Sequence, residues 1–202
     1  SVKPLKELME NTFEDLEKIS EGTMDTGVRT GFNDLDELTL GLQPSDLIVI
    51  AARPSMGKTS LALNIADYVA VEERIPVAIF SLEMSAQEVT KRMLCSRARV
   101  NSQKLKSSFK DDDVWQRLSD AAGELTSASI FIDDNADIGI MELRSKVRRL
   151  KAQHDIGLVI VDYIQLMASD RRLENRVQEI ASISRGLKIL GRDFNIPVIA
   201  VS

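Results

Sequence analysis

One short stretch near residue 50 restricts the fold of this chain more than any other. An apolar run at 47–52 is followed by a turn that ends in Gly-Lys-Thr at 57–59, and the apolar residues of 61–69 then recur at helical spacing. This order indicates a strand, a loop and a helix whose N-terminus faces the loop. Amide N–H groups turned into such a loop, at the positive end of a helix, can bind the phosphates of a nucleotide.

The residue types of this loop suit that chemistry. Gly57 lets the backbone approach the phosphates, Lys58 reaches the β- and γ-phosphates, and the Thr59 hydroxyl can bind Mg²⁺. The usual pattern begins with glycine where Ala52 stands here, and alanine suits a turn that keeps φ negative. We expect the nucleotide to contact Arg53, Pro54, Ser55, Met56, Gly57, Lys58, Thr59 and Ser60.

The rest of the chain alternates apolar runs with helical patterns. After the first strand, runs at 76–82, 129–132, 157–161 and 196–201 predict four more strands, and the helical patterns include 140–154 and 175–193. Near-continuous apolar strands alternating with helices predict an α/β fold with a mainly parallel sheet covered on both faces. We expect Trp115, on a helix beginning at Asp111, to belong to the core rather than to stack on a nucleic-acid base.

Three acids stand at predicted strand ends, where ligands of open parallel sheets bind. Asp162 follows the longest purely apolar run and is the expected Mg²⁺ residue. Glu83 is the expected base for the attacking water, because Ser85 and Glu88 already fill the capping box of the next helix. Asp133 resembles a turn residue, but the pattern alone leaves it open as a metal ligand.

Composition narrows the class of protein. The net charge of −5 comes from residues 1–50, which carry 4 Lys/Arg and 11 Asp/Glu, whereas residues 51–202 carry 22 and 20. The charge balance of residues 51–202 therefore does not exclude binding to nucleic acid. Cys95 is the single cysteine, no signal peptide precedes it, and no apolar run reaches the length of a membrane span. We expect a cytoplasmic protein with no membrane contact.

The N-terminal segment predicts a separate amphipathic helix over 3–21, followed by a turn-rich linker. We therefore divide the chain into a linker helix and linker at 1–27 and one domain at 28–202. The helix could pack on its own domain or dock on a neighbouring copy, and the linker favours the second. Its apolar stripe consists of Leu5, Leu8, Met9, Phe13, Leu16 and Ile19.

Four motifs together resemble one family, the bacterial or phage replicative DNA helicases of the DnaB type. They are residues 30–36 (Thr-Gly-Phe-Asn-Asp-Leu-Asp), 51–59 (Ala-Ala-Arg-Pro-Ser-Met-Gly-Lys-Thr), 80–85 (Phe-Ser-Leu-Glu-Met-Ser) and 161–166 (Val-Asp-Tyr-Ile-Gln-Leu). The chain looks like the C-terminal motor domain of that family with its linker helix. The resemblance implies a RecA-like P-loop NTPase fold, truncated here at its C-terminal side.

The same resemblance implies the function and partners. It implies hydrolysis of ATP with Mg²⁺, with Lys58 and Glu83 as catalytic residues and with Thr59 and Asp162, rather than Asp133, at the metal. It further implies a homo-hexamer joined by helix 3–21, translocation on single-stranded DNA to unwind duplex, and contacts with primase and a helicase loader.

One loop of the family faces the DNA channel. The segment after Asp162, with Arg171, Arg172 and Arg176, looks like that loop, although these arginines could be ordinary solvated residues. Relatives continue into a sensor residue and an arginine finger beyond Ser202, so we expect this fragment to bind nucleotide better than it hydrolyses it.

Two alternatives stay open. One is another RecA-fold ATPase, a recombinase or a clock-type protein, which shares the lead-in at 30–36. The other is a nucleotide-gated docking module for a loader or primase.

Overall fold

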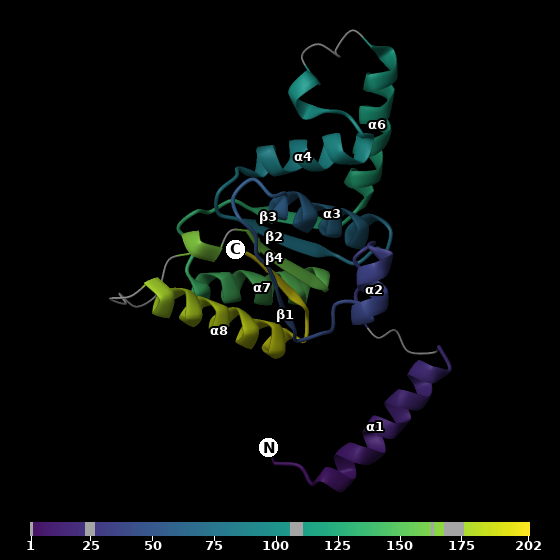
Figure 1. Cartoon of the computed structure of the whole chain (residues 1–202), viewed down its shortest axis with the longest axis vertical. Coiled ribbons are helices and arrows are strands. Elements are labelled where there is room, and N and C mark those ends of the chain that lie inside the picture. Colours follow the sequence, from purple (N-terminus) through teal and green to yellow (C-terminus); the bar gives the residue numbers. More distant parts are fainter. Residues whose placement is uncertain (1, 23–26, 106–110, 163, 168–175) are drawn as a thin grey trace.

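The computed structural model describes residues 2–22, 27–105, 111–162, 164–167 and 176–202. Its centre is a five-stranded sheet of order β1-β5-β4-β2-β3 in which all neighbouring strands are parallel (Figure 1). The strands are β1 (Leu47–Ile50), β2 (Val77–Ser81), β3 (Ile130–Asp133), β4 (Leu158–Asp162) and β5 (Val198–Val201). The helices are α1 (Leu5–Ser20), α2 (Asn33–Thr39), α3 (Lys58–Val71), α4 (Ala86–Ala98), α6 (Asp112–Ser127), α7 (Ile140–His154) and α8 (Arg176–Phe194), with short 3₁₀ turns η1 (Ser102–Lys104) and η2 (Ile164–Leu166).

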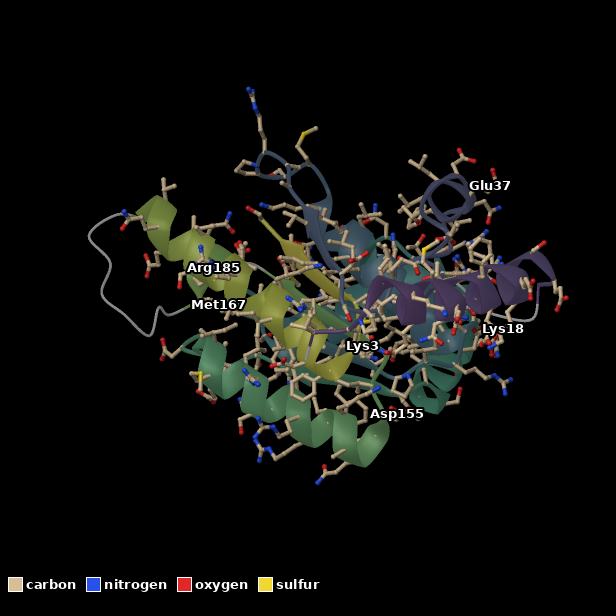
Figure 2. The ribbon with its side chains drawn as sticks, turned by 90° about the horizontal axis from the view of Figure 1, so that it is seen from below. Lys3, Lys18, Glu37, Asp155, Met167 and Arg185 are labelled. Carbon is tan, nitrogen blue, oxygen red and sulfur yellow. The ribbon has the colours of Figure 1, made fainter. Side chains whose placement is uncertain are left out.

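Helices cover both faces of the sheet, as the sequence predicts. The inner strands β2, β4 and β5 are buried along their whole length, whereas the edge strands β1 and β3 are mostly half-buried. Helices α3 and α4 close one apolar cluster on one face, and α7 and α8 close another on the opposite face. Figure 2 shows α7 and α8 side by side, with Asp155 at the end of α7 and Arg185 on α8.

Element bounds differ from the predicted ones by a few residues. Helix α7 occupies the predicted range, and the capping box is present, because the Glu88 N–H donates to the Ser85 Oγ at 3.2 Å and the Ser85 N–H donates to the Glu88 Oε2 at 2.9 Å. Strand β2 ends at Ser81, one residue earlier than predicted, and β4 includes Asp162 as its last residue.

The expectation that Trp115 belongs to the core is wrong. Its side chain is 52% exposed, because α6 turns a different stripe inward. That stripe, Val114, Leu118 and Ala121, packs with Ala98 of α4 in a small cluster of its own. Residue 115 lies about 100° around the helix from residue 114, at 3.6 residues per turn, which places it outside the buried stripe.

Arg97 links the three helices on that face. Its guanidinium is 16% exposed and forms ion pairs with Asp67 of α3, with Glu72 after α3 at 2.8 Å, and with Glu124 of α6. Burial raises the pKa of the Asp67 carboxyl even though Arg97 lies against it. Burial would lower the pKa of Arg97, but its hydrogen bonds to Glu72 and Glu124 outweigh that effect and raise it.

Helix α1 lies apart from the sheet and its covering helices (Figure 1). None of its residues is buried, and its large apolar residues Leu5, Leu8, Met9, Phe13, Leu16 and Ile19 are 39–72% exposed. In the described part of the chain, no helix combines the length and apolar character that crossing a bilayer requires.

Candidate nucleotide site

The loop between β1 and α3 has the backbone of an anion cradle. Gly57 caps α3 in the left-handed conformation, with φ of 84°, and Ser55 is also left-handed, with φ of 64°. Ala52 is not among the residues with positive φ, in line with its expected role. Helix α3 has no side-chain cap and no acidic residue in its first turn, so its first N–H groups can bind an anion.

The loop is open to solvent, whereas the two residues after it are partly enclosed. Residues 51–57 are exposed, and Lys58 and Thr59 are half-buried. The loop is anchored to the end of β5, because the Ser202 N–H donates to the Ile50 C=O at 2.9 Å and the Ala52 N–H donates to the Ser202 C=O at 3.4 Å. The cradle is therefore held over the carboxyl end of the sheet.

Asp162 meets this cradle from β4. It is 5% exposed, and Thr59 lies close enough to favour the charged form of its carboxylate. One carboxylate oxygen, Oδ1, is buried and has no hydrogen-bond partner in the described part of the chain. Burial and the nearby Glu83 raise the pKa of Asp162, and Thr59, Lys58 and Arg92 oppose that rise.

Glu83 reaches the same place from β2. Ser81 pairs with Asp162 in the register of β2 and β4, and the Leu82 N–H donates to the Asp162 C=O at 2.7 Å. Glu83 follows directly and is exposed, and neither hydrogen bond of the capping box involves it. The Ser81 hydroxyl donates to the Met84 C=O at 2.8 Å and fixes the turn that carries Glu83.

Asp133 lies elsewhere. It ends the edge strand β3, which β2 separates from β4. Its carboxylate accepts a hydrogen bond from the Lys146 ammonium at 2.6 Å and another from the Asn135 N–H at 3.0 Å. Burial would raise the pKa of Asp133, but these two donors outweigh it and lower the pKa. Asp162, rather than Asp133, is thus the acid placed beside Thr59.

The residues present suit a divalent cation. A half-buried hydroxyl and an unpartnered carboxylate oxygen are oxygen ligands of the kind that Mg²⁺ takes, and Mg²⁺ fills its other positions from phosphate and water. Within the described ranges there is no group of three or more His, Cys, Asp and Glu side chains that could hold a metal alone.

The expected DNA-contact arginines lie largely outside the described residues, and the site has two features that the sequence did not predict. Arg171 and Arg172 lie outside the described residues, and Arg176 begins α8 with only its backbone described. Sequence reasoning missed Arg92, whose charge acts on Asp162 from α4. It also missed the left-handed Ser55. The sequence did offer one signal for Arg92, because it is a basic residue on the helix that begins just after Glu83.

Comparisons with known proteins agree on one family. The DnaB-like helicase C-terminal domain family matches residues 27–202. The replicative DNA helicase DnaB of Geobacillus stearothermophilus is 46% identical over 99% of the chain, and the replicative DNA helicase DnaC of Bacillus subtilis is 44% identical over 98%. The chain spans 44% of the length of each of these two relatives.

Solved structures support the same assignment. One solved ATPase domain matches the whole chain with a TM-score of 0.90 at 34% identity, and the match covers 72% of that structure. A KaiC-like protein of Pyrococcus horikoshii matches 87% of the chain, and 70% of its own, with a TM-score of 0.59 at 17% identity, which shows the RecA-like fold alone. The resemblance noted in the sequence is thereby confirmed: the chain belongs to the DnaB-like helicase C-terminal domain family.

Proposed function

We propose that this chain is the ATP-hydrolysing motor domain of a replicative DNA helicase. The arrangement that carries the proposal is the phosphate loop at the start of α3 beside the buried Asp162 at the end of β4, with Thr59 and the charge of Glu83 close enough to act on that carboxylate. It brings together a phosphate cradle, two metal-binding oxygens and a carboxylate base, which are the parts that nucleotide hydrolysis requires. Family membership supports DNA unwinding as the work that hydrolysis drives.

Each residue has a defined task in this scheme. The N–H groups of the first turn of α3 bind the phosphates, and Lys58 offsets their negative charge. Thr59 and the Asp162 Oδ1 would hold Mg²⁺, which neutralises charge on the phosphate oxygens when it is bound. Glu83 orients the attacking water and accepts its proton.

Helix α1 supports assembly into a homo-hexamer with ATP hydrolysed at subunit interfaces. Its apolar stripe is exposed along the whole helix and needs a surface to cover it. Deleting residues 1–22 should convert a ring-sized species into smaller ones in light scattering. Replacing the exposed Glu10 and Glu14 by Gln, which leaves the stripe intact, is the matched control and should preserve the ring. Unchanged assembly after the deletion would overturn this role of α1.

Single-stranded DNA is the proposed track, with Arg171, Arg172 and Arg176 as contacts. Lys and Arg contacts to phosphate give an affinity that falls steeply with salt. The double replacement Arg171→Ala with Arg172→Ala should weaken binding and flatten the salt dependence, whereas an unchanged slope would exclude this loop.

Primase and a helicase loader are further proposed partners. A related DnaB-like replicative helicase is described together with its interactions with primase. It matches the whole chain, and 48% of its own length, with a TM-score of 0.89 at 34% identity.

The cytoplasm is the proposed location. The described structure holds Cys95 as a buried free thiol, and a reducing compartment keeps thiols in that state.

The deciding assay measures ATP hydrolysis and strand displacement together. In the intact protein, ATP turnover should rise with single-stranded DNA, duplex should be unwound, and both activities should vanish in Lys58→Ala. Strand pairing without unwinding would instead indicate a recombinase. Partner capture that needs neither ATP nor Lys58 would indicate a docking module.

A further inference from the structure

Strand β3 leaves one edge of the sheet open. It pairs only with β2 among the strands, and all four of its residues are half-buried. The Val77 N–H donates to the Ser129 C=O at 2.9 Å, so in this parallel register the backbone groups of Ile130 and Ile132 point away from β2. No hydrogen bond to these outward groups occurs within the described ranges. Two N–H and two C=O groups therefore remain available to another strand.

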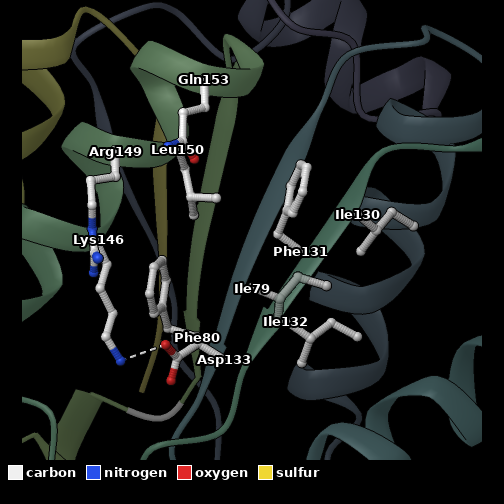
Figure 3. A pocket seen from close by; sticks show the side chains of 10 residues that line it. All are labelled: Ile79, Phe80, Ile130, Phe131, Ile132, Asp133, Lys146, Arg149, Leu150 and Gln153. Atoms are coloured by element: carbon white, nitrogen blue, oxygen red, sulfur yellow. Dashed lines mark hydrogen bonds and ion pairs between the residues drawn. The ribbon is translucent and has the colours of Figure 1, made fainter.

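A cavity of about 520 Å³ runs between this edge and α7 (Figure 3). Phe131 of β3 and Leu150 of α7 give it apolar side chains, whereas Ile130 and Ile132 border it along β3 with their side chains packed in the cluster on the other face of the sheet. Its polar side chains come mainly from α7, where Lys146, Arg149 and Gln153 line it. The groove thus combines apolar side chains, basic side chains at its rim and unpaired main-chain groups of β3, which are the features that bind an added strand.

Of the two cations on the rim, one has no ion pair with any of the described residues. Lys146 pairs with Asp133 at 2.6 Å and with Glu142 at 3.2 Å. Arg149 is exposed and forms no ion pair in the described part of the chain. A carboxylate brought to the groove would therefore find a partner in Arg149.

We propose that this groove between β3 and α7 binds an extended acidic segment of a partner protein, which adds to the sheet as a strand beside β3. Main-chain hydrogen bonds to Ile130 and Ile132 would hold the segment. On its face toward α7, an apolar side chain would cover Phe131 and Leu150, and an acidic side chain two positions along would meet Arg149. The apolar side chains of Phe131 and Leu150 and the open main-chain groups of β3 favour a protein strand over nucleic acid here. The groove is separate from Asp162, because β2 lies between β3 and the strand of Asp162.

Binding of a probe peptide tests the proposal. The probe is a fluorescent octapeptide, Val-Thr-Asp-Thr-Val-Thr-Asp-Thr, in which Val and Asp share one face of the extended chain, and its comparison is the same peptide with Lys in place of Asp. The acidic peptide should bind, with an affinity that Arg149→Glu lowers at least tenfold, and the basic peptide should not. Arg148→Glu is the matched control, since Arg148 is the adjacent exposed arginine of α7 but does not line the cavity, and it should bind like the unaltered chain.

Amide hydrogen exchange then reports the strand itself. On peptide binding, exchange at the outward N–H of Ile132 should slow at least tenfold. Ile132→Pro removes that donor, and an edge strand can accept proline, so the folded variant should lose the peptide, although its thermal midpoint should fall because the Ile132 side chain packs against the core. If Ile132→Pro does not fold, exchange at Ile132 in the unaltered chain decides the question.

Three results would overturn the proposal. They are no binding of the acidic peptide at millimolar concentration, equal effects of Arg149→Glu and Arg148→Glu, and peptide binding without slower exchange at Ile132. Competition by a single-stranded DNA 20-mer that also depends on Arg149 would assign the groove to nucleic acid instead. ATP binding measured on the same samples should be unchanged in Arg149→Glu, which separates failure of this site from failure of the nucleotide site.

Discussion

Replacing Asp162 by Asn should stabilise the fold while it removes the proposed metal ligand. The carboxylate is 5% exposed and keeps one oxygen without a hydrogen bond in the described structure. An unsatisfied buried polar group costs about 1–3 kcal/mol, and a buried charge costs more. The nearby Thr59 and the charges of Lys58 and Arg92 offset part of that cost. We therefore expect Asp162→Asn to raise the free energy of unfolding by about 1 kcal/mol, the lower end of that range. A gain of this size raises the melting temperature of a chain of this length by about 2–4 °C.

The pH dependence follows from the direction of the pKa shift. Burial raises the folded-state pKa of Asp162 above its ordinary value, so the folded chain takes up its proton at higher pH than the unfolded chain does. The penalty from the charge is present above the folded-state pKa and is relieved as pH falls through it. The advantage of Asp162→Asn should therefore be present at pH 7 and fade in acid.

Asp133→Asn is the matched control, because it removes a carboxylate from the end of another strand. The pKa of Asp133 is lowered by Lys146 and the Asn135 N–H against the effect of burial. Its contribution to stability is therefore present above the unfolded-state pKa and is lost as pH falls through the folded-state pKa. Asp133→Asn should lower stability at pH 7 by about 0.5–1 kcal/mol, as expected for a partly exposed ion pair.

Thermal unfolding by differential scanning calorimetry, in EDTA and then with Mg²⁺ and ATP, measures both effects. In EDTA the two variants should move the melting temperature in opposite directions. With Mg²⁺ and ATP the unaltered chain should gain stability and Asp162→Asn should gain much less. A lower melting temperature for Asp162→Asn in EDTA would refute the reasoning, because it would mean that the charge of Asp162 stabilises the empty site.

Three further substitutions report on other parts of the fold. Arg97→Met leaves Asp67, whose side chain is 17% exposed, without its cation, and should destabilise the chain by about 2–3 kcal/mol in urea unfolding; a loss below about 0.5 kcal/mol would contradict the linking role of Arg97. Ser85→Ala removes the capping box of α4 and should cost about 1 kcal/mol in the same assay, with no effect expected if the cap were dispensable. Gly123→Ala lies within α6 with no atom within 4 Å of the added Cβ, so it should raise stability by about 0.8 kcal/mol, and a decrease would show strain there.

Local signals in the sequence predicted local structure well. The capping box of Ser85 and Glu88 and the range of α7 depend on hydrogen bonds and periodicity within one helix, and both are present as predicted. The alternation of apolar runs and helices was enough for a parallel sheet covered on both faces.

Features that depend on distant contacts could not be predicted in the same way. Pattern alone left Asp133 and Asp162 as alternatives, because the order of the strands decides which acid lies beside Thr59. The position of Trp115 depends on which stripe of α6 meets α4, and periodicity within the helix did not choose between the stripe of Trp115 and that of Val114. The ion pairs of Arg97 join residues 25–30 positions apart, so no short window of sequence contains them.

The central claim is that Glu83 accepts a proton from the attacking water, whereas other residues, in the loop between β1 and α3, bind ATP. Glu83→Gln keeps the size of the side chain and removes its basicity, so single-turnover hydrolysis of ATP measured beside ATP affinity tests the claim most directly. We predict that Glu83→Gln binds Mg²⁺ and ATP within a factor of about 3 of the unaltered chain and hydrolyses ATP at least about 100-fold more slowly, the range expected for loss of a general base. Hydrolysis by Glu83→Gln at the rate of the unaltered chain would contradict the account.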